Sequence, residues 1–528
     1  MKDLTSYVFS FEEMIRGNFL YVDKTEYIWN LIRPSSAGYF FSRPRRFGKS
    51  LTLSTLKAIF EGKKDLFKGL AIYDKPYDWK PYPVIHLSFA DYAPVNNTIE
   101  KLDMYLHRKV REAASQSGVA LPEADDSSAA FSGLMGYYKK KKQHVVILVD
   151  EYDKPILDNI TNPEVKELLK ILKGFYSVLK EYNAQERLLF VTGVSKFCHV
   201  SLFSDLNNLT DITMSYDYAS MLGYTQEELE TYFADRIGLA SKQLNMPKDE
   251  LLPKIKAWYD GYRFHEDASH VYNPVSLAEF FTRRFEFSNY WFATGTPSFL
   301  LELIMKSKLN YSEMFTDPVS ESFFNAFEIT HLKPMVLLYQ TGYLTIDKCV
   351  EDKIPFTDQT IRKYYLKFPN LEVERSFNEN LLEYCTAIQR ESSQGFLSKL
   401  ITAVGTGDAD NFMILIQSVF AGIPYPIHVK DEHYYQTVFY VICDLLNLLV
   451  QAEVCTSRGR IDMVVQAGKW IFVMEFKLNK TADEAMKQIE NREYALKYRK
   501  EGKHVMLLGV NFDFSSGNIT DWLKEEYR

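Results

Sequence analysis

The sequence predicts an α/β protein with a doubly wound parallel sheet in its N-terminal half and a smaller α/β domain near its C-terminus. Three observations support this prediction. An apolar run at Tyr39–Phe41 leads through a basic turn into Gly48-Lys49-Ser50. A second apolar run, Val145–Val149, ends in Asp150-Glu151. Further along, the pattern changes to short strands at 459–465 and 470–477.

Length and charge limit the classes of protein to consider. At 528 residues the chain is too long for one hydrophobic core and suggests two to four domains. Its 46% hydrophobic and 25% charged residues are typical of globular proteins. The net charge of −7 makes the surface as a whole a poor attractor for nucleic acid. Any nucleic-acid site therefore has to be a local basic groove.

The cysteine spacing and the hydropathy of the chain indicate the cellular compartment of the protein. The five cysteines lie without CxxC spacing, which argues against a zinc site and fits a reducing compartment. The chain opens without a charged and then apolar leader, and no apolar run approaches ~18 residues. We therefore expect a cytoplasmic protein that does not associate with membranes.

The basic turn after the first apolar run is typical of a phosphate-binding loop. In that geometry Lys49 reaches the β- and γ-phosphates of a nucleotide, and the Ser50 hydroxyl binds Mg²⁺. Other residues of the turn and the helix start complete the expected cradle: Arg45, Arg46, Phe47, Gly48 and Leu51. The usual pattern has glycine where this chain has Arg43, so the loop is atypical. A basic surface turn is the alternative.

The carboxylates after the second apolar run favour the nucleotide interpretation. A continuous apolar run is expected of a strand buried on both faces of a parallel sheet. Asp150 is then placed to hold the Mg²⁺ water shell, and Glu151 to orient or deprotonate the attacking water. A cap that ends the strand in solvent is the alternative. The loop about a hundred residues upstream makes an ATPase the better interpretation.

Other segments are placed around this loop. Residues 9–32 show helical spacing, with Thr25 as an expected N-cap, and we expect them near the nucleotide base. The run Arg187–Lys196 predicts another buried strand, whose Thr192 or Ser195 senses the γ-phosphate unless this end is a plain loop. Thr225, with a glutamate three residues on, predicts a capping box.

The motifs in the middle of the chain indicate a function less specifically. Arg263 is a candidate sensor or finger arginine. Residues 286–375 predict a helical or winged-helix-like lid, which either closes over nucleotide or contacts DNA. The boundary to the last domain, 376–528, is placed near the polar stretch around 368–370, and the first domain is expected to span 1–285.

The two short strands near the C-terminus form a second constellation. A hairpin through the turn at 467–469 places Asp462 beside Glu475 and Lys477, which share one face of a strand. Two close carboxylates favour a divalent metal, which lowers the pKa of bound water. A lysine beside them orients that water and stabilises charge as a phosphodiester is attacked. An exposed ion pair is the alternative.

The combined motifs resemble a bacterial family in which an AAA-ATPase-like domain is fused to a C-terminal PD-(D/E)XK nuclease domain. The motifs concerned are Tyr21–Thr25, Ser42–Ser50, Val149–Asp153, Tyr290–Ser298, Gly459–Asp462 and Glu475–Lys477. The resemblance implies a P-loop NTPase fold over 1–285 and a restriction-endonuclease-like core over about 430–515. It also implies that Gln488 acts from a helix and that Glu432 or Glu453 is the upstream metal-binding acid.

Together these observations predict an ATPase with a metal-dependent nuclease domain that acts on DNA under nucleotide control. The expected cofactors are ATP and Mg²⁺, with Mn²⁺ as an alternative at the nuclease site. DNA is the expected macromolecular partner, and self-association into a homo-oligomer is compatible with the sequence. The alternative is a signal-transduction-type ATPase whose C-terminal domain only binds nucleic acid or a protein.

Overall fold

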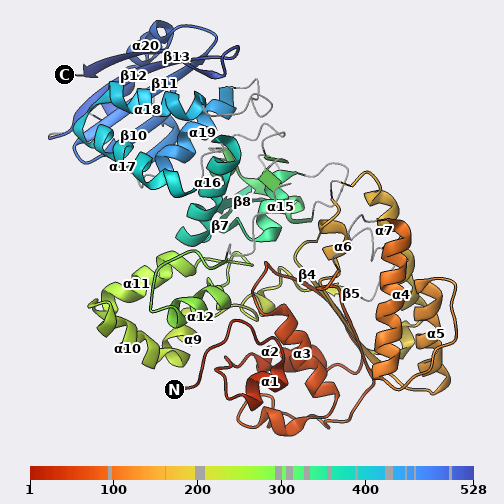
Figure 1. Cartoon of the computed structure of the whole chain (residues 1–528). Helices are drawn as coiled ribbons and strands as arrows, with labels where there is room; N and C mark the ends of the chain where they lie inside the picture. Colours follow the sequence, from red (N-terminus) through yellow and green to blue (C-terminus); the bar gives the residue numbers. More distant parts are fainter. Residues whose placement is uncertain are drawn as a thin grey trace. The chain divides into compact units, whose positions relative to one another are not determined.

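The structure is a computed structural model that describes residues 1–92, 98–160, 162–196, 209–291, 300–301, 303–304, 313–325, 333–353, 360–386, 390–421, 432–445, 449–456, 459–498 and 502–527. The chain forms two compact units (Figure 1). Unit 1 comprises Met1–Ala293 and Pro318–Glu372, and unit 2 comprises Thr294–Asp317 and Val373–Arg528. The segment expected as a lid, 286–375, is therefore shared between the two units.

Unit 1 contains the parallel sheet that the sequence predicts. Its strand order is β2-β3-β4-β1-β5, and every neighbouring pair is parallel. The strands are β1 (Gly38–Ser42), β2 (Val84–Ser88), β3 (Val145–Asp150), β4 (Glu186–Gly193) and β5 (Leu209–Asp211). All residues of β3 and β4 are buried, which explains their continuous apolar runs.

Helices cover both faces of this sheet. On one face α3 (Lys49–Phe60) packs on β3 and β4, and on the other α4 (Ile99–Gln116), α5 (Ser127–Lys140) and α7 (Val165–Glu181) form a layer (Figure 1). In α7 the buried residues recur every three or four positions, so one apolar stripe faces the layer. Shorter helical segments connect these elements: η1 (Lys64–Phe67), α6 (Lys154–Leu157), η2 (Asn183–Gln185) and η3 (Tyr216–Tyr218).

The N-terminal segment folds into α1 (Phe11–Arg16) and α2 (Thr25–Ile32). The predicted N-cap of α2 is wrong, because Thr25 is already the first helical residue. The Asp23 carboxylate instead accepts hydrogen bonds from the backbone N–H and the hydroxyl of Thr25, at 2.8 and 2.7 Å. The side chain of an aspartate two residues earlier thus supplies the hydrogen-bond acceptor that was expected of the threonine.

A helical layer follows the sheet in unit 1. It contains α9 (Gln226–Tyr232), α10 (Ala234–Gln243), α11 (Lys248–Tyr259) and α12 (Pro274–Thr282) around one apolar cluster. The predicted capping box is confirmed, since the Thr225 hydroxyl accepts the Glu228 N–H while the Glu228 carboxylate accepts the Thr225 N–H. Asn273 caps α12 in a similar way, accepting from two backbone N–H groups.

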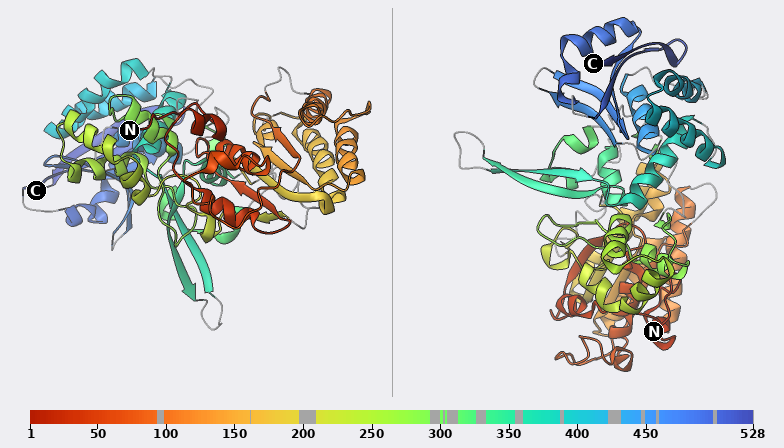
Figure 2. Two further views of the ribbon diagram at one scale, coloured as in Figure 1. Left: turned by 90° about the horizontal axis from the view of Figure 1, so that it is seen from below. Right: turned by 90° about the vertical axis from the view of Figure 1, so that its left-hand side faces the viewer.

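Unit 1 ends in a winged-helix-like module. Helix α15 (Pro334–Thr341) precedes the antiparallel strands β7 (Thr345–Lys353) and β8 (Thr360–Lys367), and β6 (Val319–Ser320) pairs with β8. Figure 2 shows β7 and β8 as a long two-stranded ribbon. We call this ribbon the wing. Two short segments lie before α15 in the sequence: α14 (Glu313–Thr316) and η5 (Glu321–Asn325).

Unit 2 contains a mixed sheet of order β13-β12-β11-β10-β9. Only the β11–β12 pair is parallel among these four pairings. The strands are β9 (Leu449–Thr456), β10 (Gly459–Ala467), β11 (Trp470–Leu478), β12 (His504–Asp513) and β13 (Asn518–Tyr527). The helices are α16 (Leu371–Thr386), whose first two residues belong to unit 1, α17 (Arg390–Thr406), α18 (Ala409–Ala421), α19 (Glu432–Leu445), α20 (Ala482–Asn491) and η8 (Tyr494–Tyr498).

Helix α20 lies very close to β12. A Cβ added at Gly509 of β12 would meet the Ala482 carbonyl oxygen at 2.5 Å and the Met486 nitrogen at 2.7 Å. The glycine therefore lets the helix backbone approach the sheet. Among the helices that the structure describes, none is long and apolar enough to span a membrane.

Candidate functional site

The turn between β1 and α3 has the geometry of a phosphate-binding loop. Gly48 has φ 93° and Arg46 has φ 67°, so the backbone is left-handed at both positions. Such alternation turns successive N–H groups towards one concave side, where an anion binds. The 12 residues of α3 begin directly behind this loop and add the positive end of the helix dipole.

Lys49 lies buried over the loop. Its ammonium donates to the carbonyl oxygens of Arg43 and Pro44, at 2.8 and 2.9 Å. Burial lowers the pKa of Lys49, and the charges of Glu151 and Asp150 oppose that shift. Ser50 follows in the first turn of α3, half-buried. Lys49 is thus held by carbonyl groups that a phosphate can outcompete.

The two acidic residues after β3 lie in different environments. Asp150 is 3% exposed and accepts a hydrogen bond of 2.9 Å from the Thr192 hydroxyl of β4. Glu151 has φ 54°, which is uncommon for a residue with a side chain. Burial raises the pKa of Glu151, while the Lys49 charge lowers it. A carboxyl group with a raised pKa beside a cation suits a group that accepts a proton from water.

Ser195, two residues after the end of β4, is hydrogen-bonded to Asp153, which lies three residues after the end of β3. Its hydroxyl donates to the Asp153 carboxylate at 2.6 Å, and its backbone N–H donates to the same oxygen at 2.7 Å. Burial raises the pKa of Asp153, and these hydrogen bonds oppose the rise. The sequence analysis assigned Asp153 no role, although it lies two residues after Glu151. Asp153 ties the ends of β3 and β4 together beside the loop.

A cavity of ≈ 80 Å³ lies next to the phosphate loop. The loop side contributes Gly48 and Thr52, and the N-terminal segment contributes Tyr21, Lys24 and Ile28. The segment that the sequence places near the nucleotide base thus lines a cavity at the loop. Lys24 itself is paired with Glu228, N to O 2.6 Å, which fastens this segment to the start of α9.

The atypical Arg43 has a structural explanation. Its guanidinium lies 4.3 Å from the centre of the Phe41 ring and 4.0 Å from that of Phe264. It also donates to the carbonyl oxygens of Thr213 and Tyr218, at 2.6 and 3.1 Å. Burial lowers the pKa of Arg43 to about 9. Arg43 therefore anchors the first residue of the loop to the segment after β5.

Arg263, the candidate sensor or finger arginine, lies at the base of the wing. Its guanidinium donates to the carbonyl oxygens of Asp347 at 3.0 Å and Ala268 at 3.2 Å, and to that of Glu266. These contacts hold the turn after α11 against β7. The side chain is thus used within the fold.

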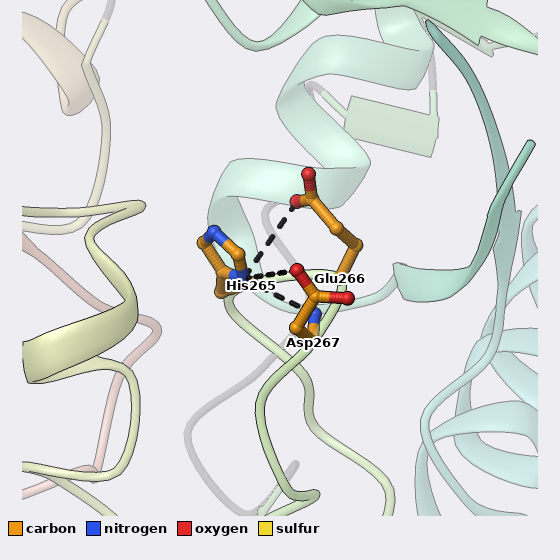
Figure 3. A group of neighbouring side chains, drawn as sticks. All are labelled: His265, Glu266 and Asp267. Carbon is orange, nitrogen blue, oxygen red and sulfur yellow. Dashed lines mark hydrogen bonds and ion pairs between the residues drawn. The ribbon is translucent and has the colours of Figure 1, made fainter. Parts of the chain in front are cut away.

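The residues after Arg263 form a group that could hold a metal ion (Figure 3). His265, Glu266 and Asp267 offer ligand atoms within 4.8 Å of one another. The His265 Nδ1 atom, however, accepts the Asp267 N–H at 3.1 Å. Glu266 accepts from Arg362 at 3.1 Å and from Tyr364 at 3.3 Å. We interpret the group as the end of a tight turn bonded to the wing.

The second constellation lies on the β10–β11 hairpin of unit 2. Met463 pairs with Met474, and continuing this register by one residue places Asp462 opposite Glu475. The Asp462 carboxylate accepts the Phe476 N–H at 2.8 Å. The Lys477 ammonium donates to the Glu475 carboxylate at 3.1 Å, and Glu475 is 1% exposed. The structure thus brings together the three residues that the sequence placed on one hairpin.

Gln488, on α20, reaches this hairpin through a tyrosine. The Gln488 side chain is hydrogen-bonded to Tyr494, whose ring is buried in η8. Burial raises the pKa of the Tyr494 hydroxyl, and the charges of Glu475 and Asp462 raise it further. The Tyr494 hydroxyl is thus influenced both by the helix glutamine and by the two acids. The sequence analysis assigned it no role.

Two residues are candidates for the metal-binding acid upstream of the hairpin. Glu432 is the first residue of α19 and Glu453 lies in β9. The side chains of both fall outside the part of the chain that the structure describes.

Comparisons with known proteins agree with this two-part organisation. The family model described as predicted AAA-ATPase matches residues 7–203, and that of the PD-(D/E)XK nuclease superfamily matches residues 430–522. An uncharacterized protein in the vnfD 5′ region of Azotobacter chroococcum mcd 1 is 36% identical over 522 residues. The match covers 96% of each chain.

Solved structures show similarity at a low level. ORC1 of Aeropyrum pernix in complex with DNA is 12% identical and covers 68% of this chain and 91% of its own, with a TM-score of 0.26. Cdc6p of Pyrobaculum aerophilum is 10% identical and covers 72% and 100%, with a TM-score of 0.25. Similarity of this extent has no bearing on function. On the full-length match and the two domain models, the chain belongs to the family that joins a predicted AAA-ATPase domain to a C-terminal PD-(D/E)XK nuclease superfamily domain.

Proposed function

We propose that this protein is an ATP-regulated, metal-dependent nuclease that acts on DNA. ATP binds and is hydrolysed at the loop of unit 1, and phosphodiester cleavage takes place at the hairpin of unit 2. The observation that supports the nuclease most strongly is the β10–β11 register, which sets Asp462 against Glu475 with Lys477 on the same carboxylate. A fold that only binds nucleic acid has no chemical need for all three.

At the loop, the proposed roles follow from the contacts of the nucleotide-free protein. Lys49 exchanges the carbonyl oxygens of Arg43 and Pro44 for the β- and γ-phosphates, which are stronger acceptors. Ser50 and Asp150 would hold Mg²⁺. A bound Mg²⁺ ion supplies positive charge next to the phosphates. The remaining loop residues, Arg45, Arg46, Phe47, Gly48 and Leu51, surround the anion, with Ser195 at the strand end beside it.

Glu151 is the proposed base at this site. Its raised pKa favours proton transfer from the attacking water, and its position after Asp150 places it at the carboxyl end of β3. The cavity beside Gly48 is the proposed site of the nucleotide base.

At the hairpin, Asp462 and Glu475 offer carboxylate oxygens, the ligand type that Mg²⁺ and Mn²⁺ prefer, with Glu432 or Glu453 as a third donor. A divalent ion there supplies a Lewis acid and a water of lowered pKa. Lys477 contacts Glu475 and is placed to stabilise negative charge on the attacked phosphodiester. Gln488 positions the Tyr494 hydroxyl beside the acids.

The functional modules proposed from the sequence are 1–285 for nucleotide, 286–375 as a lid and 376–528 for cleavage, with a core at about 430–515. A cytoplasmic location and assembly into a homo-oligomer belong to the same proposal. The net charge of −7 requires that DNA meets a local basic groove.

A second candidate function is a signal-transduction-type ATPase whose unit 2 only binds nucleic acid or a protein. One observation favours a protein over nucleic acid as the partner in this second function. On the wing, Arg362 pairs with Glu351, Lys363 with Asp352 and Lys367 with Asp347, across β7 and β8. Pairing of this kind neutralises cations that would otherwise contact phosphates.

A cleavage assay separates the two functions. Supercoiled, linear and single-stranded DNA and RNA are incubated with the full-length protein in Mg²⁺ or Mn²⁺, with and without ATP. Cleavage that is lost in Lys477→Ala, with ATP turnover intact, supports the nuclease. ATP turnover without cleavage of any substrate favours the switch.

A further inference from the structure

Two residues near the end of the first segment of unit 1 are fastened to the phosphate loop. The Arg46 guanidinium donates to the Tyr290 carbonyl oxygen at 2.8 Å, and the Trp291 indole N–H donates to the Arg45 carbonyl oxygen at 3.4 Å. We call Tyr290 and Trp291 the strap. The chain passes from unit 1 into unit 2 after Ala293, two residues beyond the strap.

A buried carboxylate holds the strap from the other side. One oxygen of Glu372 accepts the Tyr290 N–H at 2.6 Å and the Trp291 N–H at 2.8 Å. Glu372 is 1% exposed and is the last residue of unit 1, directly before the chain enters unit 2 again at Val373. One carboxylate therefore joins two of the places where the chain leaves unit 1.

The strap is also packed against α15 and the residues after it. The Trp291 ring meets the Tyr343 ring edge-on, with centroids 5.2 Å apart. A Cβ at Gly342 would lie 2.5 Å from Pro44 of the loop and 3.5 Å from the Trp291 ring. The loop, the strap and the end of α15 thus form one tightly packed contact, in which a shift of the loop displaces the strap.

Arg46 has two competing acceptors when a nucleotide is bound. Its acceptor at Tyr290 is a neutral carbonyl oxygen, whereas a phosphate offers charged oxygens that bind guanidinium roughly twice as strongly. Burial raises the pKa of Glu372 to about 7, and the Arg46 charge opposes that rise. Withdrawal of Arg46 therefore weakens both the carbonyl contact and the charge that keeps Glu372 a strong acceptor.

We propose that the strap and Glu372 form a relay, in which a bound nucleoside triphosphate draws Arg46 away from Tyr290 and loosens the chain at its two exits from unit 1. The proposal rests on nucleotide binding at the loop, as proposed above, and names the residues through which that binding reaches the chain leading into unit 2. Glu372 acts here as a positioning residue, through the two backbone N–H groups that it holds.

The two N–H groups report directly on the relay. Hydrogen–deuterium exchange of the full-length protein, resolved to the Tyr290 and Trp291 amides, is measured with Mg²⁺ alone and with Mg²⁺ and AMPPNP. Binding of AMPPNP is measured by calorimetry on the same samples. We expect both amides to exchange about tenfold faster with AMPPNP, since a loosened charge-assisted hydrogen bond protects less.

Variants distinguish the relay from a general loss of protection in unit 1. In Arg46→Ala the two amides should exchange fast without nucleotide, whereas in the control variant Arg33→Ala, which removes an exposed arginine outside the loop, they should exchange as in the parent protein. In Glu372→Ala both amides should exchange fast in either condition. Glu372→Gln keeps an acceptor oxygen and should restore slow exchange without nucleotide and the response to AMPPNP.

The outcomes that overturn the proposal are distinct. If calorimetry shows binding and the two amides exchange at an unchanged rate, the relay is wrong and the nucleotide site stands. If Arg46→Ala leaves nucleotide-free exchange slow, the relay is also wrong. If AMPPNP does not bind at all, the proposed nucleotide site and the relay both fail.

Discussion

At the scale of single residues, Arg43 shows how a loop tolerates the loss of its usual glycine. Its buried guanidinium contacts two aromatic rings and three backbone carbonyl oxygens, those of Ser42, Thr213 and Tyr218. A glycine at this position would remove all of these hydrogen bonds and ring contacts. The departure from the usual pattern is thus part of the packing beside the loop.

Replacing Arg43 by glycine should therefore destabilise the protein. We expect Arg43→Gly to lower the free energy of unfolding by roughly 3 kcal/mol, because buried carbonyl groups lose their donors. Urea denaturation followed by circular dichroism measures the change. Arg45→Ala, an exposed neighbour in the same loop, serves as the control and should stay within about 0.5 kcal/mol of the parent protein. Equal losses in both variants would contradict the anchoring role.

Glu372 should make stability depend on pH. Burial raises its pKa from 4.5 to about 7, so the native state keeps a proton that the unfolded state releases within this window. The contribution of Glu372 alone to the free energy of unfolding should therefore fall as pH rises from about 4.5 to about 7, by at most about 1.4 kcal/mol per pH unit, and then level off. Urea denaturation at closely spaced pH values measures the slope.

Glu372→Gln supplies the control for this slope, because the amide does not titrate. The variant should lose most of the fall between pH 4.5 and 7. A smaller slope should remain, since burial also raises the pKa of Asp260, to about 6. A variant with the full slope of the parent protein would assign the titration to another group.

At the scale of elements, the β10–β11 hairpin of unit 2 carries the proposed cleavage site, and helix α20 contributes Gln488 to it. We expect Lys477→Ala to reduce cleavage at least about 100-fold, because the charge next to the attacked phosphodiester is lost, while nucleotide binding stays intact. Rates of plasmid cleavage and nucleotide titrations measure the two effects. If Lys477→Ala cleaves at the parental rate, Lys477 is not part of the cleavage site.

Tyr494→Phe probes the link to Gln488. Loss of the hydroxyl removes its hydrogen bond and should slow cleavage about tenfold without unfolding unit 2. Tyr498→Phe is the matched control in the same 3₁₀ turn, and it should cleave at the parental rate. If both variants cleave equally, Tyr494 has no special role.

The contact of α20 with β12 makes another prediction. Gly509→Ala would place a Cβ 2.5 Å from the Ala482 carbonyl oxygen, so the helix has to shift. We expect a loss of about 2–3 kcal/mol in unfolding free energy, measured by thermal and urea denaturation. Gly133→Ala is the control, because a Cβ at that position of α5 meets nothing within 4 Å, and it should be neutral or stabilising.

The elements that the sequence predicted well are those with a strong local pattern. β3 and β4 are buried on both faces, so their apolar runs are continuous. By contrast, most side chains of β13 are exposed and polar, so no apolar run marks it. Helix α20 ends at Asn491, Glu493 takes φ 48°, and a 3₁₀ turn follows from Tyr494. Such a turn leaves the helical spacing of apolar residues nearly unchanged.

The same distinction, between features with a local sequence pattern and features without one, applies to the two candidate sites. Asp462, Glu475 and Lys477 could be placed together from the sequence because strand alternation and one short turn fix their relation. Asp153, Tyr494 and Glu372 could not, because each acts through a partner far along the chain or through backbone groups. Long-range contacts of this kind have no local pattern.

At the scale of the whole molecule, the proposed function requires that a site in unit 1 communicates with a site in unit 2. Lys49→Ala should abolish nucleotide binding, because the anion loses its main charge, and cleavage by this variant should no longer respond to ATP. Cleavage rates with and without ATP, compared with the parent protein, measure the response. A variant that binds no nucleotide and still responds to ATP would contradict control through this loop.

The division of the chain has a consequence for how such a protein arises. Residues 294–317 belong to unit 2 and residues 318–372 to unit 1, so neither unit is one continuous stretch. Cutting the gene at any single point leaves at least one unit without part of its own polypeptide. Exchange of one complete unit for another by recombination therefore needs more than one breakpoint.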